Sequence, residues 1–189
     1  MTDIVTKVED FSQLTEREKE EILEFIVDTY GKPVTNFAFT YVKDWGLAED
    51  IAQDVFLKVF DHLHQFRRDA SLKTWIYQIT ANQCKDLMRK KYFKTTLLTD
   101  WVGNILNNQR QETSAESKVL QVSQEREIAQ EVLRLPIKYR EIIILYYYEE
   151  LSTVKISQFL QMSVATVKTR LQRGRQQLKR SWKGGDWLE

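Results

Sequence analysis

Hydrophobic residues recur at helical spacing along most of the chain. After Thr15 the spacing predicts an amphipathic helix, which Thr15 and Glu18 are suited to begin and whose inner face consists of Ile22, Phe25, Ile26 and Tyr30. Gly31 and Pro33 are expected to break or kink this helix, because proline lacks a backbone donor and clashes with the preceding turn. A second run with the same period contains Val34, Phe37, Ala38 and Tyr41.

Two more helices are predicted in the same half of the chain. One spans roughly residues 48–63 after a turn at 44–46, and its apolar stripe consists of Ala52, Val55, Phe56, Val59, Phe60 and Leu63. The other spans about residues 71–92 after the polar loop 64–70, and its inward residues are Trp75, Ile76, Ile79 and Leu87. These helices define a predicted N-terminal domain, residues 15–94.

The C-terminal part predicts a helix-turn-helix inside a second helical domain, residues 124–183. The inner face of its first short helix consists of Val154, Ile156, Phe159 and Leu160. Residues 161–163 form a tight connection, and Ser163 is a suitable N-cap for the second helix. The inner face of that second helix consists of Val164, Val167, Leu171 and Leu178.

The residues between the two domains, 95–123, are polar and poor in core positions, which predicts a flexible linker. Inside it, the stretch 97–106 is expected to be a short helix or a docking segment. The composition agrees with an all-α fold of two small helical domains, because the 189 residues include only 6 Gly and 2 Pro and 42% are hydrophobic.

The sequence also indicates where the protein works. The N-terminus has neither the basic start nor the apolar core of a signal peptide, and no apolar run is long enough to span a bilayer. The single cysteine, Cys84, cannot form an internal disulfide. We therefore expect a soluble cytoplasmic protein that does not insert into membranes.

The net charge of +1 conceals separate acidic and basic blocks. Acidic residues dominate between residues 9 and 61, residues 85–94 are mostly basic, and every charged residue between 155 and 183 is basic. Residues 163–180 alone hold six Lys and Arg and no acidic residue. Such blocks suit distinct surfaces for distinct partners, although a single block can also be a solvated helix face.

The basic block coincides with the second helix of the helix-turn-helix. The residues that project outward near its N-terminal half are Thr166, Lys168, Thr169, Arg170, Gln172 and Arg173. This half of a recognition helix enters the major groove, where Arg and Lys read guanine. Arg175, Lys179 and Arg180 suit the phosphate backbone. DNA binding therefore explains the charge, although any basic helical hairpin gives a similar pattern.

Three stretches, residues 48–60, 66–91 and 135–180, resemble the extracytoplasmic-function (ECF) sigma factors of the sigma-70 family. They read AEDIAQDVFLKVF, FRRDASLKTWIYQITANQCKDLMRKK and LPIKYREIIILYYYEELSTVKISQFLQMSVATVKTRLQRGRQQLKR, in the family's order. The resemblance implies a non-enzymatic subunit without a cofactor, which recruits RNA polymerase core to promoters and helps to melt them. It also implies an anti-sigma factor as a partner, linked to the membrane in most relatives.

The resemblance implies three sets of site residues. The first would bind a coiled coil of the polymerase largest subunit and consists of Asp50, Gln53 and Asp54. The second would capture flipped bases of the −10 element, with help from Lys91, and consists of Phe66, Arg67, Arg68, Asp69, Ala70, Ser71, Lys73, Asn82, Arg89 and Lys90. The third would read the −35 element and consists of Thr166, Lys168, Thr169, Arg170, Gln172, Arg173 and Arg175.

Three positions depart from the family's pattern. Gln161 and Glu150 stand where many relatives carry Gly, and Lys155 stands where relatives usually carry Glu. A left-handed backbone at Gln161 is less comfortable than it would be for glycine, because the Cβ atom crowds the backbone.

Other chemistry has weaker support in the sequence. His62 and His64 lack Cys or paired carboxylates at ligand spacing, and Cys84 lacks an evident His base, so we expect no metal-binding or catalytic residue. Trp75 and residues 146–148 are expected to pack in the core rather than to stack on bases. Two other functions stay open: a dimeric helix-turn-helix regulator with a sensory N-terminal half, and a nucleic-acid enzyme, which would need clustered carboxylates or a metal site.

Overall fold

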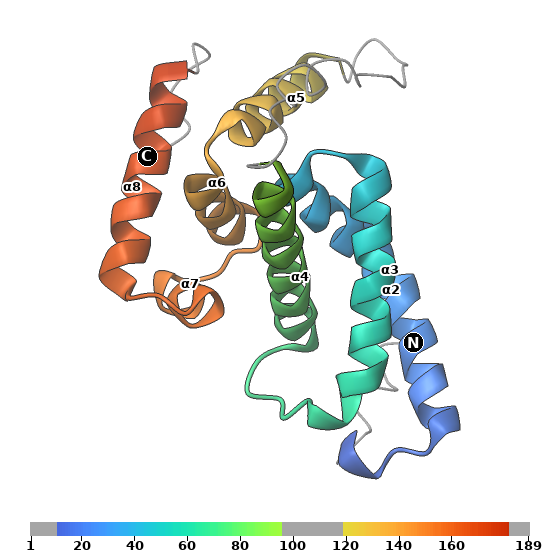
Figure 1. Cartoon of the computed structure of the whole chain (residues 1–189). Coiled ribbons are helices and arrows are strands. Elements are labelled where there is room, and N and C mark those ends of the chain that lie inside the picture. Colours follow the sequence, from blue (N-terminus) through green and yellow to red (C-terminus); the bar gives the residue numbers. More distant parts are fainter. Residues whose placement is uncertain (1–10, 96–118, 182–189) are drawn as a thin grey trace. The chain divides into compact units, whose positions relative to one another are not determined.

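The computed structural model describes residues 11–95 and 119–181, and every element within these residues is helical (Figure 1). The chain separates into two compact units, Met1–Lys94 (unit 1) and Thr95–Glu189 (unit 2). The predicted all-α fold is therefore confirmed. The stretch 97–106, for which a short helix or docking segment is predicted, lies outside the described residues, as does most of the predicted linker.

Unit 1 contains α2 (Glu16–Val42), α3 (Trp45–His62) and α4 (Leu72–Thr95), with short 3₁₀ turns η1 (Phe11–Gln13) and η2 (Leu63–Gln65). The predicted inner stripe of α3 is confirmed at its centre, where Ala52, Val55, Val59 and Leu63 are buried. Between α2 and α4, the rings of Phe37 and Tyr77 stack with their centroids 4.5 Å apart. The core therefore comes from one face of each helix, which leaves the opposite faces for partners.

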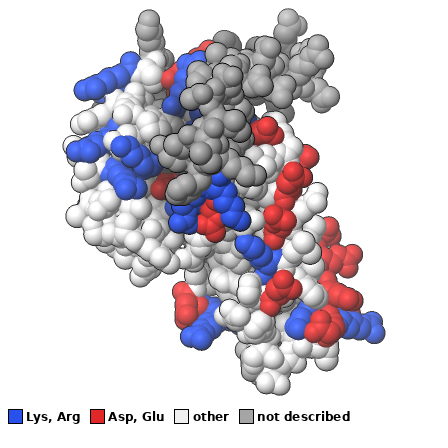
Figure 2. Space-filling view, in the orientation of Figure 1, with Lys and Arg blue, Asp and Glu red and all other residues white. Residues whose placement is uncertain are grey.

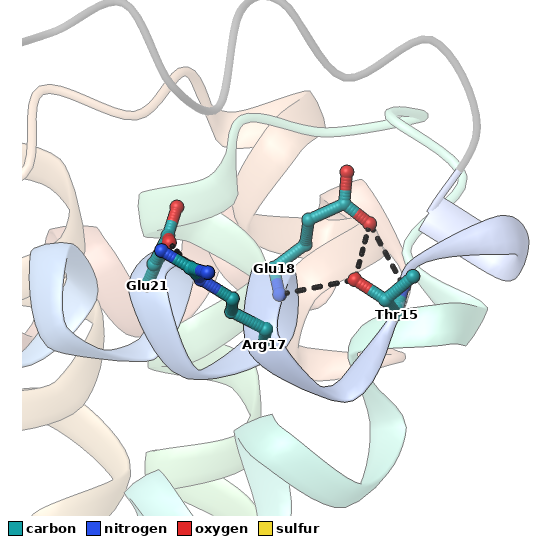
Figure 3. A network of polar contacts seen from close by, with 4 residues as sticks. All are labelled: Thr15, Arg17, Glu18 and Glu21. Atoms are coloured by element: carbon teal, nitrogen blue, oxygen red, sulfur yellow. Dashed lines mark hydrogen bonds and ion pairs between the residues drawn. The ribbon is translucent and has the colours of Figure 1, made fainter.

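The start of α2 is a capping box, as the sequence predicts (Figure 3). The hydroxyl of Thr15 accepts a hydrogen bond of 3.3 Å from the Glu18 backbone N–H, and the Glu18 carboxylate accepts one of 2.8 Å from the Thr15 backbone N–H. These bonds satisfy donors that a helix start leaves without a partner. The Thr15 hydroxyl also donates a hydrogen bond of 2.7 Å to the Glu18 carboxylate. This bond, followed by the one from the Thr15 backbone N–H, lowers the pKa of the Glu18 carboxyl below its ordinary value.

The predicted break at Gly31 and Pro33 is wrong. A single helix runs through both residues to Val42. Proline removes one backbone donor from the helix, but Ile26 and Val34 on either side of it are fully buried on the core face. Tertiary packing on both sides of the proline thus outweighs one lost hydrogen bond.

The turn predicted at 44–46 is also shorter than the sequence indicates. Lys43 adopts a left-handed conformation, with φ 57° and ψ 30°, and ends α2. The side chain of Asp44 then accepts a hydrogen bond of 2.9 Å from the Leu47 N–H, so α3 begins at Trp45. Helix capping by Asp44 explains why two residues of the predicted turn are helical.

Unit 2 contains α5 (Val119–Arg134), α6 (Ile137–Ile143), the π-helical turn η3 (Ile144–Tyr148), α7 (Thr153–Leu160) and α8 (Val164–Ser181). Gly174 of α8 packs against α6, and a Cβ atom at this position would lie 3.1 Å from Cγ1 of Ile143. A side chain there would therefore force the Ile143 side chain to shift. The sequence analysis did not single out this glycine, because its role depends on a partner helix 30 residues earlier.

The helix-turn-helix consists of α7, the connection at Gln161–Ser163 and α8. Gln161 is left-handed, with φ 52° and ψ 48°, and the Ser163 hydroxyl accepts a hydrogen bond of 3.1 Å from the Thr166 N–H. Both features agree with the predicted tight connection. The predicted inner position of Val154 is wrong, since its side chain is 53% exposed while Ile156 is fully buried. Residues two positions apart in a helix are separated by about 200° around its axis, so Val154 and Ile156 cannot lie on the same face.

Candidate nucleic-acid and polymerase interfaces

The two units present different charges on the surface. Figure 2 shows Lys and Arg side chains gathered over the part of the view that α8 occupies in Figure 1, and many Asp and Glu side chains over the part that α2 and α3 occupy. This distribution follows the acidic and basic blocks of the sequence. A basic helix and an acidic helix on separate units can serve different partners.

The recognition helix α8 has one exposed basic face. Among the residues predicted to contact the −35 element, the exposed ones are Lys168, Thr169, Gln172 and Arg173. Lys179 and Arg180 continue the exposed face toward the end of the helix. Val167, Leu171 and Leu178 are buried on the opposite side, as predicted, while Val164 is half-buried. Packing of the inner face thus determines which side chains can reach DNA.

Four of the predicted −35 residues make contacts inside unit 2. The exposed Thr169 donates a hydrogen bond of 2.9 Å from its hydroxyl to the Ala165 carbonyl. Thr166 is half-buried, and its hydroxyl lies 2.8 Å from the hydroxyl of Ser163. The guanidinium of Arg170 lies 4.0 Å from the buried carboxylate of Glu141 on α6. Nε of Arg175 donates a hydrogen bond of 2.8 Å to the hydroxyl of Tyr147 in η3. Sequence spacing could not reveal the contacts of Arg170 and Arg175, because their partners come from other elements, whereas Thr166 contacts the residue that caps its own helix.

The polar face of α3 carries the predicted polymerase residues. Asp50, Gln53 and Asp54 are all exposed, and Leu57, one turn farther along the same face, is 65% exposed. The sequence analysis missed Leu57, although the spacing of 50, 54 and 57 places it on this face. A single exposed leucine is common on protein surfaces, but its position beside Asp54 adds an apolar group to this polar face.

Gln83 of α4 is a second residue that the sequence analysis missed on this surface. Its side-chain N–H donates a hydrogen bond of 3.1 Å to Asp54, and its side-chain oxygen accepts one from Lys58. Both partners lie on α3, so Gln83 connects this helix to α4. No local pattern could reveal the connection, since Gln83 lies 29 positions from Asp54 and 25 from Lys58 in the sequence.

The loop predicted to capture −10 bases begins with a packed residue. The Phe66 side chain is only 8% exposed, and its ring contacts those of Phe11 and Trp75, with centroid distances of 5.2 and 5.3 Å. The other predicted −10 residues are exposed, namely Arg67, Arg68, Asp69, Ala70, Ser71, Lys73, Asn82, Arg89 and Lys90. Phe66 therefore fixes the base of the loop, and its neighbours form the accessible surface.

The loop leads directly into α4. Arg68 is left-handed, with φ 60°, and its guanidinium lies 5.3 Å from the centre of the Phe11 ring. The Ser71 hydroxyl accepts a hydrogen bond of 3.1 Å from the Thr74 N–H and caps the helix. The ammonium of Lys73 lies 5.4 Å from the centre of the Tyr77 ring. These contacts give the loop a defined shape.

Asn82 lies farther along α4, about 15 Å from the start of the helix at a rise of 1.5 Å per residue. It is exposed, and among the described residues its side chain has no hydrogen-bond partner. Helical periodicity places it on the same face as Trp75, which is half-buried, and Arg89, which is exposed and paired with Asp86. The amide can therefore donate and accept toward a ligand. Lys91, a further predicted contact, has a side chain outside the described residues.

Residues that suggested other chemistry have ordinary surroundings. His62 and His64 are exposed, and the His64 ring lies 3.2 Å from the Gln65 amide. Cys84 is completely buried, and burial raises the pKa of its thiol to about 12. Trp75 packs on Phe66 but is half-buried, so it lies at the edge of the core. The predicted core position of Tyr148 is wrong, since this residue is 56% exposed, while Tyr146 and Tyr147 are half-buried. Within the described ranges, 11–95 and 119–181, no helix combines the length and apolar character needed to cross a membrane.

Comparison with known proteins adds to this geometry. The family model of sigma-70 region 2 matches residues 26–93, and that of sigma-70 region 4 matches residues 125–178. The ECF RNA polymerase sigma factor SigW of Bacillus subtilis is 32% identical over 160 residues, which cover 82% of this chain and 86% of SigW. SigM of the same bacterium is 30% identical over 160 residues, which cover 85% of this chain and 94% of SigM.

Two solved structures have a similar fold. The sigma factor RpoE, in a complex with the anti-sigma factor NepR from Bartonella quintana, matches 83% of this chain and 94% of its own, with a TM-score of 0.66 and 20% identity. CnrH, in a complex with the cytosolic domain of CnrY, matches 90% of each chain, with a TM-score of 0.57 and 20% identity. Both agree with the helical architecture described above.

Proposed function

Since the chain belongs to the ECF sigma factors of the sigma-70 family, we propose that its two units divide promoter recognition between them. The protein is an alternative sigma factor, which directs the initiation of transcription by RNA polymerase. In this proposal residues 15–94 bind core polymerase and the −10 element, and residues 124–183 bind the −35 element. The observation that carries it is the match of one family region to each compact unit.

The exposed face of α3 is the proposed contact with core polymerase, a coiled coil of the largest subunit. Asp50, Gln53 and Asp54 supply carboxylate and amide groups to basic and polar partners, and Leu57 supplies an apolar side chain beside them. Charged rims with an apolar centre are typical of specific protein interfaces. The exposure of all four side chains supports this role.

The loop 66–73 and α4 are the proposed site for the melted −10 strand. Single-stranded DNA is held by basic groups along its backbone and by polar groups at the edges of unstacked bases. Arg67, Arg89 and Lys90 are exposed cations near the two ends of this surface, and Asn82 lies between them. Because Asn82 is about 15 Å from the start of α4, we expect it to contact a different nucleotide from the loop.

The exposed face of α8 is the proposed reader of the −35 duplex. Arg173 and Lys168 can bond guanine, Gln172 can bond adenine, and Thr169 can contact either base pair. Lys179 and Arg180, near the end of the helix, suit phosphate contacts. The burial of the opposite face supports this orientation.

The remaining parts of the proposal come from the family. Sigma factors are non-enzymatic initiation factors, and we propose that this chain likewise catalyses no reaction, needs no cofactor and acts in the cytoplasm. RpoE and CnrH were solved in complexes, the first with an anti-sigma factor and the second with a cytosolic domain of CnrY. An anti-sigma factor, linked to the membrane, is therefore a proposed partner of this chain.

Transcription with purified core polymerase tests the proposed function. The full chain and core should produce specific transcripts from a promoter library, and neither component alone should do so. A helix-turn-helix regulator would instead bind duplex promoter DNA tightly without polymerase. A nucleic-acid enzyme would cut or join DNA in a metal-dependent manner without polymerase.

A further inference from the structure

Two half-buried arginines of the recognition helix contact side chains of other elements in unit 2. Nη1 of Arg170 lies 4.0 Å from Oε1 of Glu141, whose side chain is 5% exposed, while the Arg170 side chain is 33% exposed. Glu141 belongs to α6, in the core that supports α8. A buried carboxylate needs a charged or hydrogen-bonding partner to offset its loss of water. The Arg170 guanidinium is a group of this kind at ion-pair distance.

Arg175 makes a second contact of this kind five residues later. Its Nε donates a hydrogen bond of 2.8 Å to the Tyr147 hydroxyl, and its guanidinium lies 5.4 and 5.5 Å from the centres of the Tyr146 and Tyr147 rings. Cations stack favourably on aromatic faces at such distances. Between the two arginines, Gly174 lets α8 approach Ile143 of α6.

These contacts act together with the buried inner face of Val167, Leu171 and Leu178 on how α8 is rotated about its own axis. Turning the helix by one residue, about 100°, would separate Arg170 from Glu141 and leave a buried carboxylate without that partner. It would also replace Gly174 by a side chain at the close contact with Ile143. The rotation in turn decides which residues face outward, namely Lys168, Thr169, Gln172 and Arg173.

We propose that Glu141 and Arg170 are positioning residues for −35 recognition: their ion pair orients α8, and the bases are read by Lys168, Thr169, Gln172 and Arg173. This inference rests on the proposed function of unit 2. It assigns Arg170 a role different from the base contact that the sequence suggests, and it gives Glu141, which is buried away from solvent, an effect on promoter preference.

The experiment compares four variants of the full chain: Glu141→Gln, Arg170→Gln, the double variant and Arg173→Gln. Glu141→Gln keeps the shape of the side chain and one acceptor oxygen, and it removes the negative charge. Arg173→Gln is the matched control, because this arginine is exposed on the same helix. Each variant is combined with core polymerase, and transcription is measured on promoters with randomised −35 elements. Chemical unfolding of each free chain is measured in parallel.

If the pair positions the helix, Glu141→Gln and Arg170→Gln should each reduce base discrimination at several −35 positions together, by roughly threefold to tenfold. The double variant should lose no more base discrimination than the single variant with the larger loss, because the effects of residues in direct contact are coupled. Arg173→Gln should instead lose discrimination at one position. Arg170→Lys, which keeps the positive charge, should retain more discrimination than Arg170→Gln.

Two results would overturn the proposal. Loss of preference at a single position in Arg170→Gln, with Glu141→Gln unchanged, would make Arg170 a base-reading residue. Lower unfolding stability with unchanged preferences would make the pair merely structural. If the wild-type chain directs no transcription with core polymerase, the proposed function fails instead. The unfolding measurements still test the ion pair in that case. If the effects of Glu141→Gln and Arg170→Gln on the free energy of unfolding add up in the double variant, the two residues do not couple α6 to α8.

Discussion

Nε2 of Gln83, on α4, donates a hydrogen bond of 3.1 Å to Oδ2 of Asp54, on α3. The oxygen of the same amide accepts a hydrogen bond from Lys58, so one side chain holds an acid and a base of the neighbouring helix. The Asp54 carboxylate is thereby oriented before any partner binds. Because Asp54 belongs to the proposed polymerase surface and Gln83 to the helix proposed to contact the −10 strand, the contact links the two surfaces of unit 1.

The first prediction concerns this polymerase surface. Gln53→Ala combined with Asp54→Ala should weaken binding to core polymerase, because two polar contacts are lost. The melting temperature should fall only slightly, since both residues are exposed and the one hydrogen bond lost, from Gln83 to Asp54, contributes about 1 kcal/mol or less. Affinity for core polymerase can be measured by competition with a labelled wild-type chain.

The matched control replaces two exposed acids of α2, Glu24→Ala combined with Asp28→Ala. It removes more negative charge than the test variant but leaves α3 intact. Unchanged affinity in the Gln53 and Asp54 variant would contradict the assignment. An equal loss in the control would point to net charge rather than to a specific contact.

A second prediction concerns residues that hold a conformation favoured by glycine. Gln161 and Glu150 both have a left-handed backbone, with φ 52° and 53°. This conformation costs a residue with a Cβ atom about 1–2 kcal/mol, while glycine loses roughly 0.5–1 kcal/mol of additional chain entropy on folding. Gln161→Gly and Glu150→Gly should therefore each raise the free energy of unfolding of unit 2, by about 0.5–1 kcal/mol. Denaturant unfolding of the full chain measures the change.

Gln158→Gly provides the control, because Gln158 is exposed and lies inside α7 with a helical backbone. Glycine at such a position should destabilise the protein by about 1 kcal/mol. If Gln161→Gly lowers stability as much as Gln158→Gly does, the turn of the helix-turn-helix is not left-handed in solution.

Local rules predicted what depends on neighbouring residues in the sequence. The Thr15 capping box, the buried stripe of α3 and the Ser163 cap of α8 all follow from side chains a few positions apart. The sequence reasoning failed where tertiary packing outweighs a local preference. Pro33 is tolerated inside α2 because the residues around it are buried on one face.

In the candidate site, too, helical periodicity was predictable and contacts between elements were not. Helical periodicity placed Lys168, Gln172 and Arg173 outward, and the structure agrees. Periodicity could not reveal that Arg170 reaches Glu141, because that contact depends on how far α6 lies from α8. It could not reveal the Gln83 contact with Asp54 for the same reason.

A third prediction follows from the burial of Cys84. Burial raises the pKa of its thiol from an ordinary 9.0 to about 12, so the folded chain keeps the proton at a pH where the unfolded chain loses it. Below the unfolded pKa both states are protonated, and Cys84 adds no pH dependence. As the pH rises above 9, loss of the proton stabilises the unfolded state but not the folded state. The contribution of Cys84 should therefore lower the free energy of unfolding at pH 10 by roughly 1–2 kcal/mol relative to its value below pH 9.

Cys84→Ala isolates this effect from the titration of lysines and tyrosines. The difference in the free energy of unfolding between pH 8 and pH 10 should be larger for the wild type than for Cys84→Ala, because only the wild type carries the thiol. Guanidinium unfolding curves at both pH values measure it. Equal pH dependence of the two proteins would mean that the thiol is exposed to water in the folded state.

The final prediction concerns Asn82 and the opening of DNA. Asn82 is exposed on α4, and among the described residues its amide has no hydrogen-bond partner. An Asn with a structural role would be expected to bond its own loop or helix, whereas an amide without a partner can bond the edge of an extruded base. Asn82→Ala should therefore leave the melting temperature nearly unchanged, since no bond within the described residues is lost.

The same variant should bind a promoter with a mismatched, already open −10 element at a nearly normal rate, because we propose that recruitment depends on α3 and α8. It should, however, lose discrimination at one −10 base, since one amide can read one base edge. Transcription from promoters varied at each −10 position measures this. Gln78→Ala, one turn earlier on the same face and half-buried, tests whether the effect is specific to Asn82. A general loss across all bases, together with a lower melting temperature, would make Asn82 a structural residue and not part of a base-binding site.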